Sequence, residues 1–186
     1  MGATGDNKQD FFSVKLFFLI LGGIAAYNIS GWMQGEPEWE VLTYEPGAFL
    51  VQTAGKPDLR KLPEELPFGE VEFEYLMFAR NEVQYAISYG EVPAEVAADS
   101  ATAARRDRML LKAEGEILAE EMVQLSGQPA RQTLIKASDK SLLQLQSLQV
   151  GTQLYSLMAA GAPSAFDDNP DVALFFASFK LDKPKK

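Results

Sequence analysis

The chain has 186 residues, a formal net charge of −9, and neither cysteine nor histidine. These missing residue types exclude disulfides, thiolate nucleophiles, thiolate zinc sites and histidine-based acid–base or haem chemistry, so we expect a protein that is not an enzyme and holds no cofactor. The acidic charge disfavours binding to nucleic acid and to anionic lipid headgroups.

The first predicted element is a membrane anchor. Eighteen residues, Leu16–Met33, carry no charge, and as a helix they would reach about 27 Å, close to the hydrocarbon thickness of a bilayer. We predict a cytoplasmic tail over 1–10, a transmembrane helix over 11–33 and a linker over 34–38. The residues expected to form the anchor are Leu16, Phe17, Phe18, Leu19, Ile20, Leu21, Gly22, Gly23, Ile24, Tyr27 and Trp32, the last two with rings suited to the headgroup region.

A cleaved signal peptide is the alternative interpretation of the same segment. Its basic region would hold Lys8 and Lys15, its apolar region would span 16–24, and cleavage after a small-residue motif would fall before Ala26. We favour the retained anchor because the apolar stretch continues past this point to Met33.

Basic residues near the anchor predict its orientation. Lys8 and Lys15 precede the apolar stretch, and the next basic residue is Lys56. The positive-inside rule therefore places the N-terminus in the cytoplasm and the following domain in the periplasm or another extracytoplasmic space. The expected localisation is a single-pass membrane protein.

Alternating apolar residues predict strands after the linker. The clearest signal is a hairpin with strands over 71–79 and 82–89, joined at Arg80 and Asn81, since asparagine tolerates a positive φ. The other segments expected here are strands over 39–43 and 48–53, and a loop-rich stretch punctuated by Gly55, Pro57, Pro63 and Pro67 that holds only short extended pieces.

A helix is predicted over 97–114, where proline and glycine are absent and good helix formers dominate. Asp99 or Ser100 would cap its start, and Gly115 would end it. Three arginines on this helix suggest either a phosphate-binding patch or a solvated face. We favour the solvated face because acidic residues lie nearby; the three are Arg105, Arg106 and Arg108.

Five glutamates lie between residues 64 and 74, before and within the first strand of the predicted hairpin. They could face a basic partner, but we favour a solvated strand edge whose charges discourage aggregation. They are Glu64, Glu65, Glu70, Glu72 and Glu74.

Four further strands and a final helix complete the predicted elements. Asn169 is placed to cap the helix and Pro170 fits its first position. The nearby oxygens could instead bind Ca²⁺, but the spacing matches no calcium loop, and capping is favoured. The strands span 116–125, 130–137, 141–150 and 153–160; the helix spans 166–181 with the apolar stripe Val172, Phe175, Phe176 and Phe179; the calcium alternative would use Asp167, Asp168, Asn169 and Asp171.

Strands and helices are segregated without βαβ alternation, which predicts an α+β domain with a mostly antiparallel sheet of six to eight strands. Several segments resemble the PsbP-like family of α/β/α sandwich domains, over about 39–182, with 183–186 as a basic tail. They are 49–51 with 55–57, 85–89 with 92–93, 127–131, 154–157 and 175–181.

The resemblance implies an accessory role, because PsbP itself is an extrinsic subunit on the lumenal side of photosystem II. We therefore expect a subunit that caps or stabilises a larger membrane complex, such as a photosynthetic reaction centre, with integral membrane subunits as partners and lipid around the anchor. The alternative is an anchored binding module for a small apolar ligand, lipid or pigment. Its pocket would be lined by aromatic residues that otherwise fill the core: Phe73, Tyr75, Phe78, Tyr85, Tyr89 and Tyr155.

Overall fold

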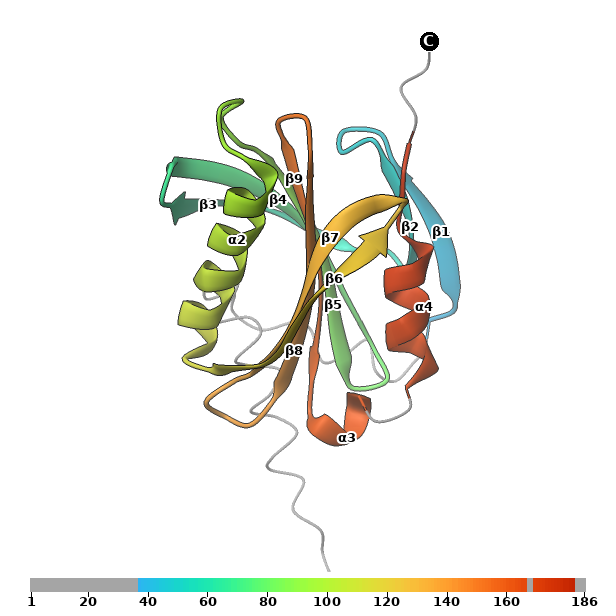
Figure 1. Cartoon of the computed structure of the whole chain (residues 1–186). Helices are drawn as coiled ribbons and strands as arrows, with labels where there is room; N and C mark the ends of the chain where they lie inside the picture. The colour runs from blue at the N-terminus through green and yellow to red at the C-terminus, as the bar shows by residue number, and fades with distance from the viewer. Residues whose placement is uncertain (1–36, 167–168, 183–186) are drawn as a thin grey trace, which may run out of the picture.

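The computed structural model describes residues 37–166 and 169–182 (Figure 1). The predicted tail and anchor, together with Asp167 and Asp168, lie outside the described residues. The elements are β1 (Trp39–Tyr44), β2 (Phe49–Ala54), β3 (Asp58–Leu66), β4 (Gly69–Arg80), β5 (Val83–Glu91), α2 (Ala98–Ala113), β6 (Glu116–Leu125), β7 (Gln128–Lys136), β8 (Leu142–Val150), β9 (Gln153–Gly161), α3 (Pro163–Phe166), α4 (Pro170–Ser178) and β10 (Lys180–Leu181). Among them, no helix is long and apolar enough to cross a membrane.

The elements form three layers. The central layer is a seven-stranded sheet in the order β3-β4-β5-β9-β8-β7-β6, with every neighbouring pair antiparallel. Helix α2 covers one face, while α4 and a three-stranded sheet, β1-β2-β10, cover the other (Figure 1). The predicted α+β class and mostly antiparallel sheet are confirmed. The small sheet beside α4 was not predicted.

Two apolar cores separate the layers. On β4, Phe73 and Tyr75 lie in the core beneath α2, whereas Leu76 and Phe78 lie in the core beneath α4 and the small sheet. Successive side chains of a strand point to opposite faces, so a central strand covered on both sides is apolar in both registers. This is why the sequence of β4 changes from alternating to continuously apolar along its length.

The β4–β5 hairpin is confirmed, but its turn lies one residue later than predicted, because Arg80 is still in β4 and pairs with Val83. The loop-rich stretch predicted before the hairpin is wrong. Asn81 and Glu82 form the turn with φ of 49° and 61°, as a two-residue hairpin turn requires. Upstream, the chain forms the nine-residue strand β3, paired along its length with β4. Pro63 is tolerated there because β3 is at the edge of the sheet, where a missing N–H need not break a ladder.

The helix ends differ in part from the predictions. Neither predicted cap of α2 is used: Ala97 occupies the N-cap with no side-chain hydrogen bond, and Glu114 ends the helix in the left-handed conformation. Gly115 is needed for close approach, since a Cβ there would lie 2.4 Å from the Lys136 carbonyl oxygen. In α4, the Asn169 side chain does accept from the backbone N–H of Asp171, at 2.9 Å.

Helix α4 spans Pro170–Ser178 rather than the predicted 166–181, and Phe166 belongs to the separate helix α3. Phe179 has extended backbone angles, and the next two residues form β10, which pairs with β2. The apolar stripe therefore begins in the helix and ends beyond it, with all four members buried against the second core.

The carboxylate of Asp171 joins the start of α4 to two other elements. Its oxygens accept hydrogen bonds from Trp39 Nε1 at 3.0 Å, Arg80 Nε at 3.0 Å and Asn81 Nδ2 at 2.6 Å. Burial opposes ionisation, but these donors hold the pKa of Asp171 below its usual range. These contacts show that Asp171 binds protein donors, while Asp167 and Asp168 of the calcium alternative lie outside the described residues.

We expect Asp171→Asn to lower the free energy of unfolding by about 2 kcal/mol, because an amide N–H₂ would face donors that now bind a charged acceptor. Urea denaturation measures the change. Asp107→Asn is the control: Asp107 contacts only its neighbour Arg106 among the described residues and its side chain is 62% exposed, so its effect stays within about 0.5 kcal/mol. Equal effects of the two substitutions would contradict the assigned role.

Candidate functional site

A row of polar residues crosses the sheet beneath α2. Cross-strand pairing aligns Tyr75 on β4, Ser88 on β5, Ser156 on β9, Ser147 on β8 and Arg131 on β7. Because paired residues point to the same face, the row forms a polar line across an otherwise apolar face. Helix α2 lies over this line and places an arginine on it.

That arginine is Arg105, whose side chain is fully buried. Its guanidinium donates to Glu64 at 2.5 Å, to Ser156 at 3.2 Å and to Ser88 at 3.1 Å. It also donates to the Tyr75 hydroxyl at 2.6 Å, and that hydroxyl in turn donates to Glu64. Each of the three guanidinium nitrogens therefore donates at least one hydrogen bond, and four of the five N–H groups meet an acceptor among the described residues. Such pairing offsets the cost of burying the charge.

The ion pair between Arg105 and Glu64 determines the protonation states of Glu64 and Tyr75. Burial alone would raise the pKa of Glu64, but the charges of Arg105 and Lys112 outweigh burial and hold that pKa below its usual value. Burial raises the pKa of the Tyr75 phenol well above its usual value. At neutral pH the carboxylate is thus ionised and the phenol is neutral.

Both predictions of solvated charge fail at this cluster. Arg105 is not on a solvated face, and Glu64 is only 2% exposed rather than part of a solvated edge. Arg106 does lie at the surface, paired with Glu120 at 2.9 Å. The helical spacing offered a signal, since Arg105 falls four residues after the buried Ala101, on the apolar face of α2.

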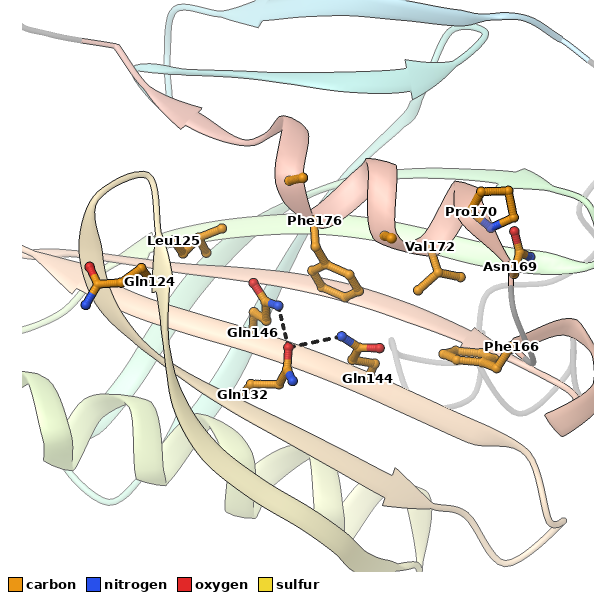
Figure 2. Close-up of a pocket in the computed structure, with 12 residues that line it drawn as sticks. Gln124, Leu125, Gln132, Gln144, Gln146, Phe166, Asn169, Pro170, Val172 and Phe176 are labelled. Carbon is orange, nitrogen blue, oxygen red and sulfur yellow. Dashed lines mark hydrogen bonds between the residues drawn. The ribbon is translucent and has the colours of Figure 1, made fainter.

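A groove lies on the opposite face of the sheet, between α4 and the strands β6, β7 and β8 (Figure 2). Its volume is about 660 Å³. Apolar side chains of the helix point down toward amide side chains that rise from the strands. The lining residues are Gln124, Leu125, Gln132, Gln144, Gln146, Phe166, Asn169, Pro170, Val172, Ala173, Phe176 and Ala177.

The amide floor is organised around Gln132. Its Oε1 accepts from Gln144 Nε2 at 3.1 Å and from Gln146 Nε2 at 2.5 Å (Figure 2). Its Nε2 donates to Glu121 at 2.7 Å. Amides donate and accept without changing charge. Together with the apolar wall of α4, they suit binding of a neutral, partly apolar group rather than proton transfer.

The aromatic residues predicted to line a pocket do not line this groove. Five of them are buried in the two cores, and Tyr89 packs against the second core from a partly buried position. Ring contacts hold them together; Phe78 and Tyr85, for example, stack with centroids 5.1 Å apart. The predicted core role of these residues is therefore the one that the structure supports.

In residues 37–166 and 169–182, no three acidic side chains are placed to hold a metal ion.

Comparison with known proteins identifies a similar fold but no match by sequence. No family profile matches the chain, and no curated protein matches it. The structure is similar to the solution structure of cyanobacterial PsbP (CyanoP) from Synechocystis sp. PCC 6803, with a TM-score of 0.55 and 10% sequence identity over 85% of this chain and 98% of that chain. A crystal structure of a protein of unknown function from Pseudomonas aeruginosa gives a TM-score of 0.41 and 9% identity over 73% and 91% of the two chains. The first similarity shows that the fold is PsbP-like.

Proposed function

We propose that this chain is a non-catalytic accessory subunit of a larger membrane protein complex, anchored by a helix over 11–33, with its PsbP-like domain on the extracytoplasmic side. One combination carries the proposal: a PsbP-like fold directly follows eighteen uncharged residues. A photosynthetic reaction centre is the host that we propose, from the family resemblance. Its integral membrane subunits would be the partners of the anchor and the domain.

The chemistry of the two polar sites supports a binding role. The groove offers amides and apolar side chains, and the charged cluster is buried beneath α2 with its arginine committed to protein acceptors. Both arrangements favour recognition and stability over bond breaking. The groove also favours a second candidate function, an anchored binding module for a small apolar ligand, lipid or pigment.

The test is to isolate the full chain from its membranes in mild detergent through a C-terminal tag. Leu181 pairs with Phe49, while β1 begins at Trp39 at the other end of the small sheet. A tag after Leu181 therefore extends from the end of the small sheet opposite to the one at which the proposed anchor enters. Native electrophoresis, mass spectrometry and an absorbance scan then identify whatever accompanies the chain. We expect a large band that contains integral membrane subunits in fixed ratio.

A variant with a charge in the apolar stretch provides the control. Leu21→Arg places a cation near the centre of the predicted span, at a cost to membrane insertion of about 2.5–3.5 kcal/mol, and should shift the chain out of the membrane fraction. The intact mass separates the retained anchor from cleavage before Ala26. A small colourless band from the native chain would contradict the subunit proposal, and a co-purifying small molecule in such a band would favour the second candidate.

A further inference from the structure

The charges around Glu64 include more cations than anions. Glu64 Oε2 lies 2.5 Å from Arg105 Nη1 and 3.9 Å from Arg108 Nε, and Glu64 Oε1 lies 2.8 Å from Lys112 Nζ. Three cations against one carboxylate leave an excess of two positive charges. This excess lies within a domain whose overall charge is negative.

The other acidic side chains of β3 and α2 do not offset this excess. Each of them contacts a different cation or leaves the strand from the opposite face. Asp58 pairs with Arg60, Asp99 with Arg131 and Asp107 with Arg106, while Glu65 follows Glu64 along β3 and is exposed.

Two of the three cations reach solvent. The side chains of Arg105 and Glu64 are 0% and 1% exposed, whereas those of Lys112 and Arg108 are 15% and 31% exposed. The Nε of Arg108 is buried and has no hydrogen-bond partner within the described part of the chain. At 3.9 Å, Glu64 is too distant to serve as that partner.

The protonation of Lys112 responds to the same excess. Burial lowers the pKa of Lys112, and the charges of Arg105 and Arg108 lower it further, so that the attraction of Glu64 does not restore the usual value. An anion beside Lys112 would oppose this lowering. The site is therefore short of negative charge on its solvent side.

We propose that Arg108 and Lys112 form a binding site for a doubly charged phosphate group, at the surface where α2 passes β3. A guanidinium and an ammonium four residues apart on one helix lie side by side and provide donors suited to phosphate oxygens. A dianion matches the excess of two charges, which a single carboxylate would leave half compensated. The phosphate could come from a free ion or from a lipid headgroup.

The test is calorimetric titration of inorganic phosphate into the full chain in mild neutral detergent, at neutral pH and low salt. Loss of a charged donor should weaken binding by about tenfold or more, so we expect that increase in Kd for Arg108→Gln. Arg106→Gln is the matched control on the same helix. Because Arg106 is already paired with Glu120 and Asp107, the Kd for phosphate should change by less than about twofold in Arg106→Gln.

Two further measurements keep the result independent of folding. Lys112→Gln should weaken phosphate binding as Arg108→Gln does, and the unfolding midpoint of each variant in phosphate-free buffer shows whether it folds. NMR titration of the Lys112 side chain should show its pKa rising when phosphate is added to the wild type, and not in Arg108→Gln. Short-chain phosphatidic acid, titrated in parallel, separates the sources: tighter binding than phosphate assigns a lipid headgroup, and weaker binding assigns a free ion.

Three results would overturn the proposal. The first is an equal phosphate affinity in the wild type and in a folded Arg108→Gln variant. The second is a Kd for acetate as low as that for phosphate, since the site would then not select a dianion. The third is a pKa of Lys112 that phosphate leaves unchanged.

Discussion

Replacement of Glu64 by glutamine is expected to lower the free energy of unfolding by about 3–5 kcal/mol, the usual effect of removing one partner from a buried ion pair. Arg105 would remain fully buried with only neutral acceptors, because its sole carboxylate contact is Glu64 at 2.5 Å among the described residues. Lys112 and Arg108 would then repel it without compensation. Urea denaturation, with unchanged slope, measures the loss.

The pH dependence of stability provides a second readout. The pKa of Glu64 is held below its usual value in the folded state, so the charged carboxylate stabilises the fold at pH values above its unfolded pKa, near 4.5. That contribution disappears as the pH falls through the lower, folded pKa. The Glu64→Gln variant should therefore lose less stability on acidification than the wild type does.

The neighbouring Glu65 provides the control. It is exposed on the same strand, and Glu65→Gln should change the free energy of unfolding by no more than about 0.5 kcal/mol. If the two substitutions had equal effects, the cluster beneath α2 would not contribute to stability as we infer. The double variant Glu64→Leu/Arg105→Met should lose less free energy of unfolding than the sum of the losses of the two single variants, since it leaves no unpaired charge from this pair.

The elements that the sequence predicts well are those whose signal is local. The β4–β5 hairpin combines period-two alternation with a turn residue that accepts a positive φ, and both lie within a few positions of each other. The start of α4 is similar, because the cap at Asn169 and Pro170 needs only its own first turn. Strand β3 was missed for a non-local reason: Pro63 breaks an interior strand but not an edge, and edge position is a property of the whole sheet.

Both candidate sites depend on pairing that sequence distance conceals. Arg105 and Glu64 are 41 residues apart and meet only because α2 crosses a sheet edge formed by β3. The groove floor needs the register of β7 against β8, which places Gln132 opposite Gln146. A shift of one residue would turn these amides to the α2 face. Sequence patterns predict the strands, but they do not predict this register.

The second large effect expected is from Phe175→Ala, which should lower the free energy of unfolding by about 3–5 kcal/mol. Phe175 is fully buried at the centre of the core beneath α4. Its ring lies 5.0 Å from that of Tyr85, 5.8 Å from Phe78 and 5.2 Å from Phe176. Truncation removes these contacts and leaves a cavity that stacked aromatic rings cannot easily fill.

The same substitution should loosen one wall of the groove, because α4 is held against the sheet mainly by its buried aromatic and aliphatic side chains. Hydrogen exchange should therefore accelerate at the α4 amides more than at those of α2, which packs on the other core. Leu174→Ala is the control on the same helix: Leu174 is 38% exposed and should change stability by about 0.5 kcal/mol or less. Equal destabilisation by the two variants, or equal acceleration of exchange in both helices, would mean that Phe175 does not hold α4 against the sheet. The position of the groove's helical wall would then depend on other contacts.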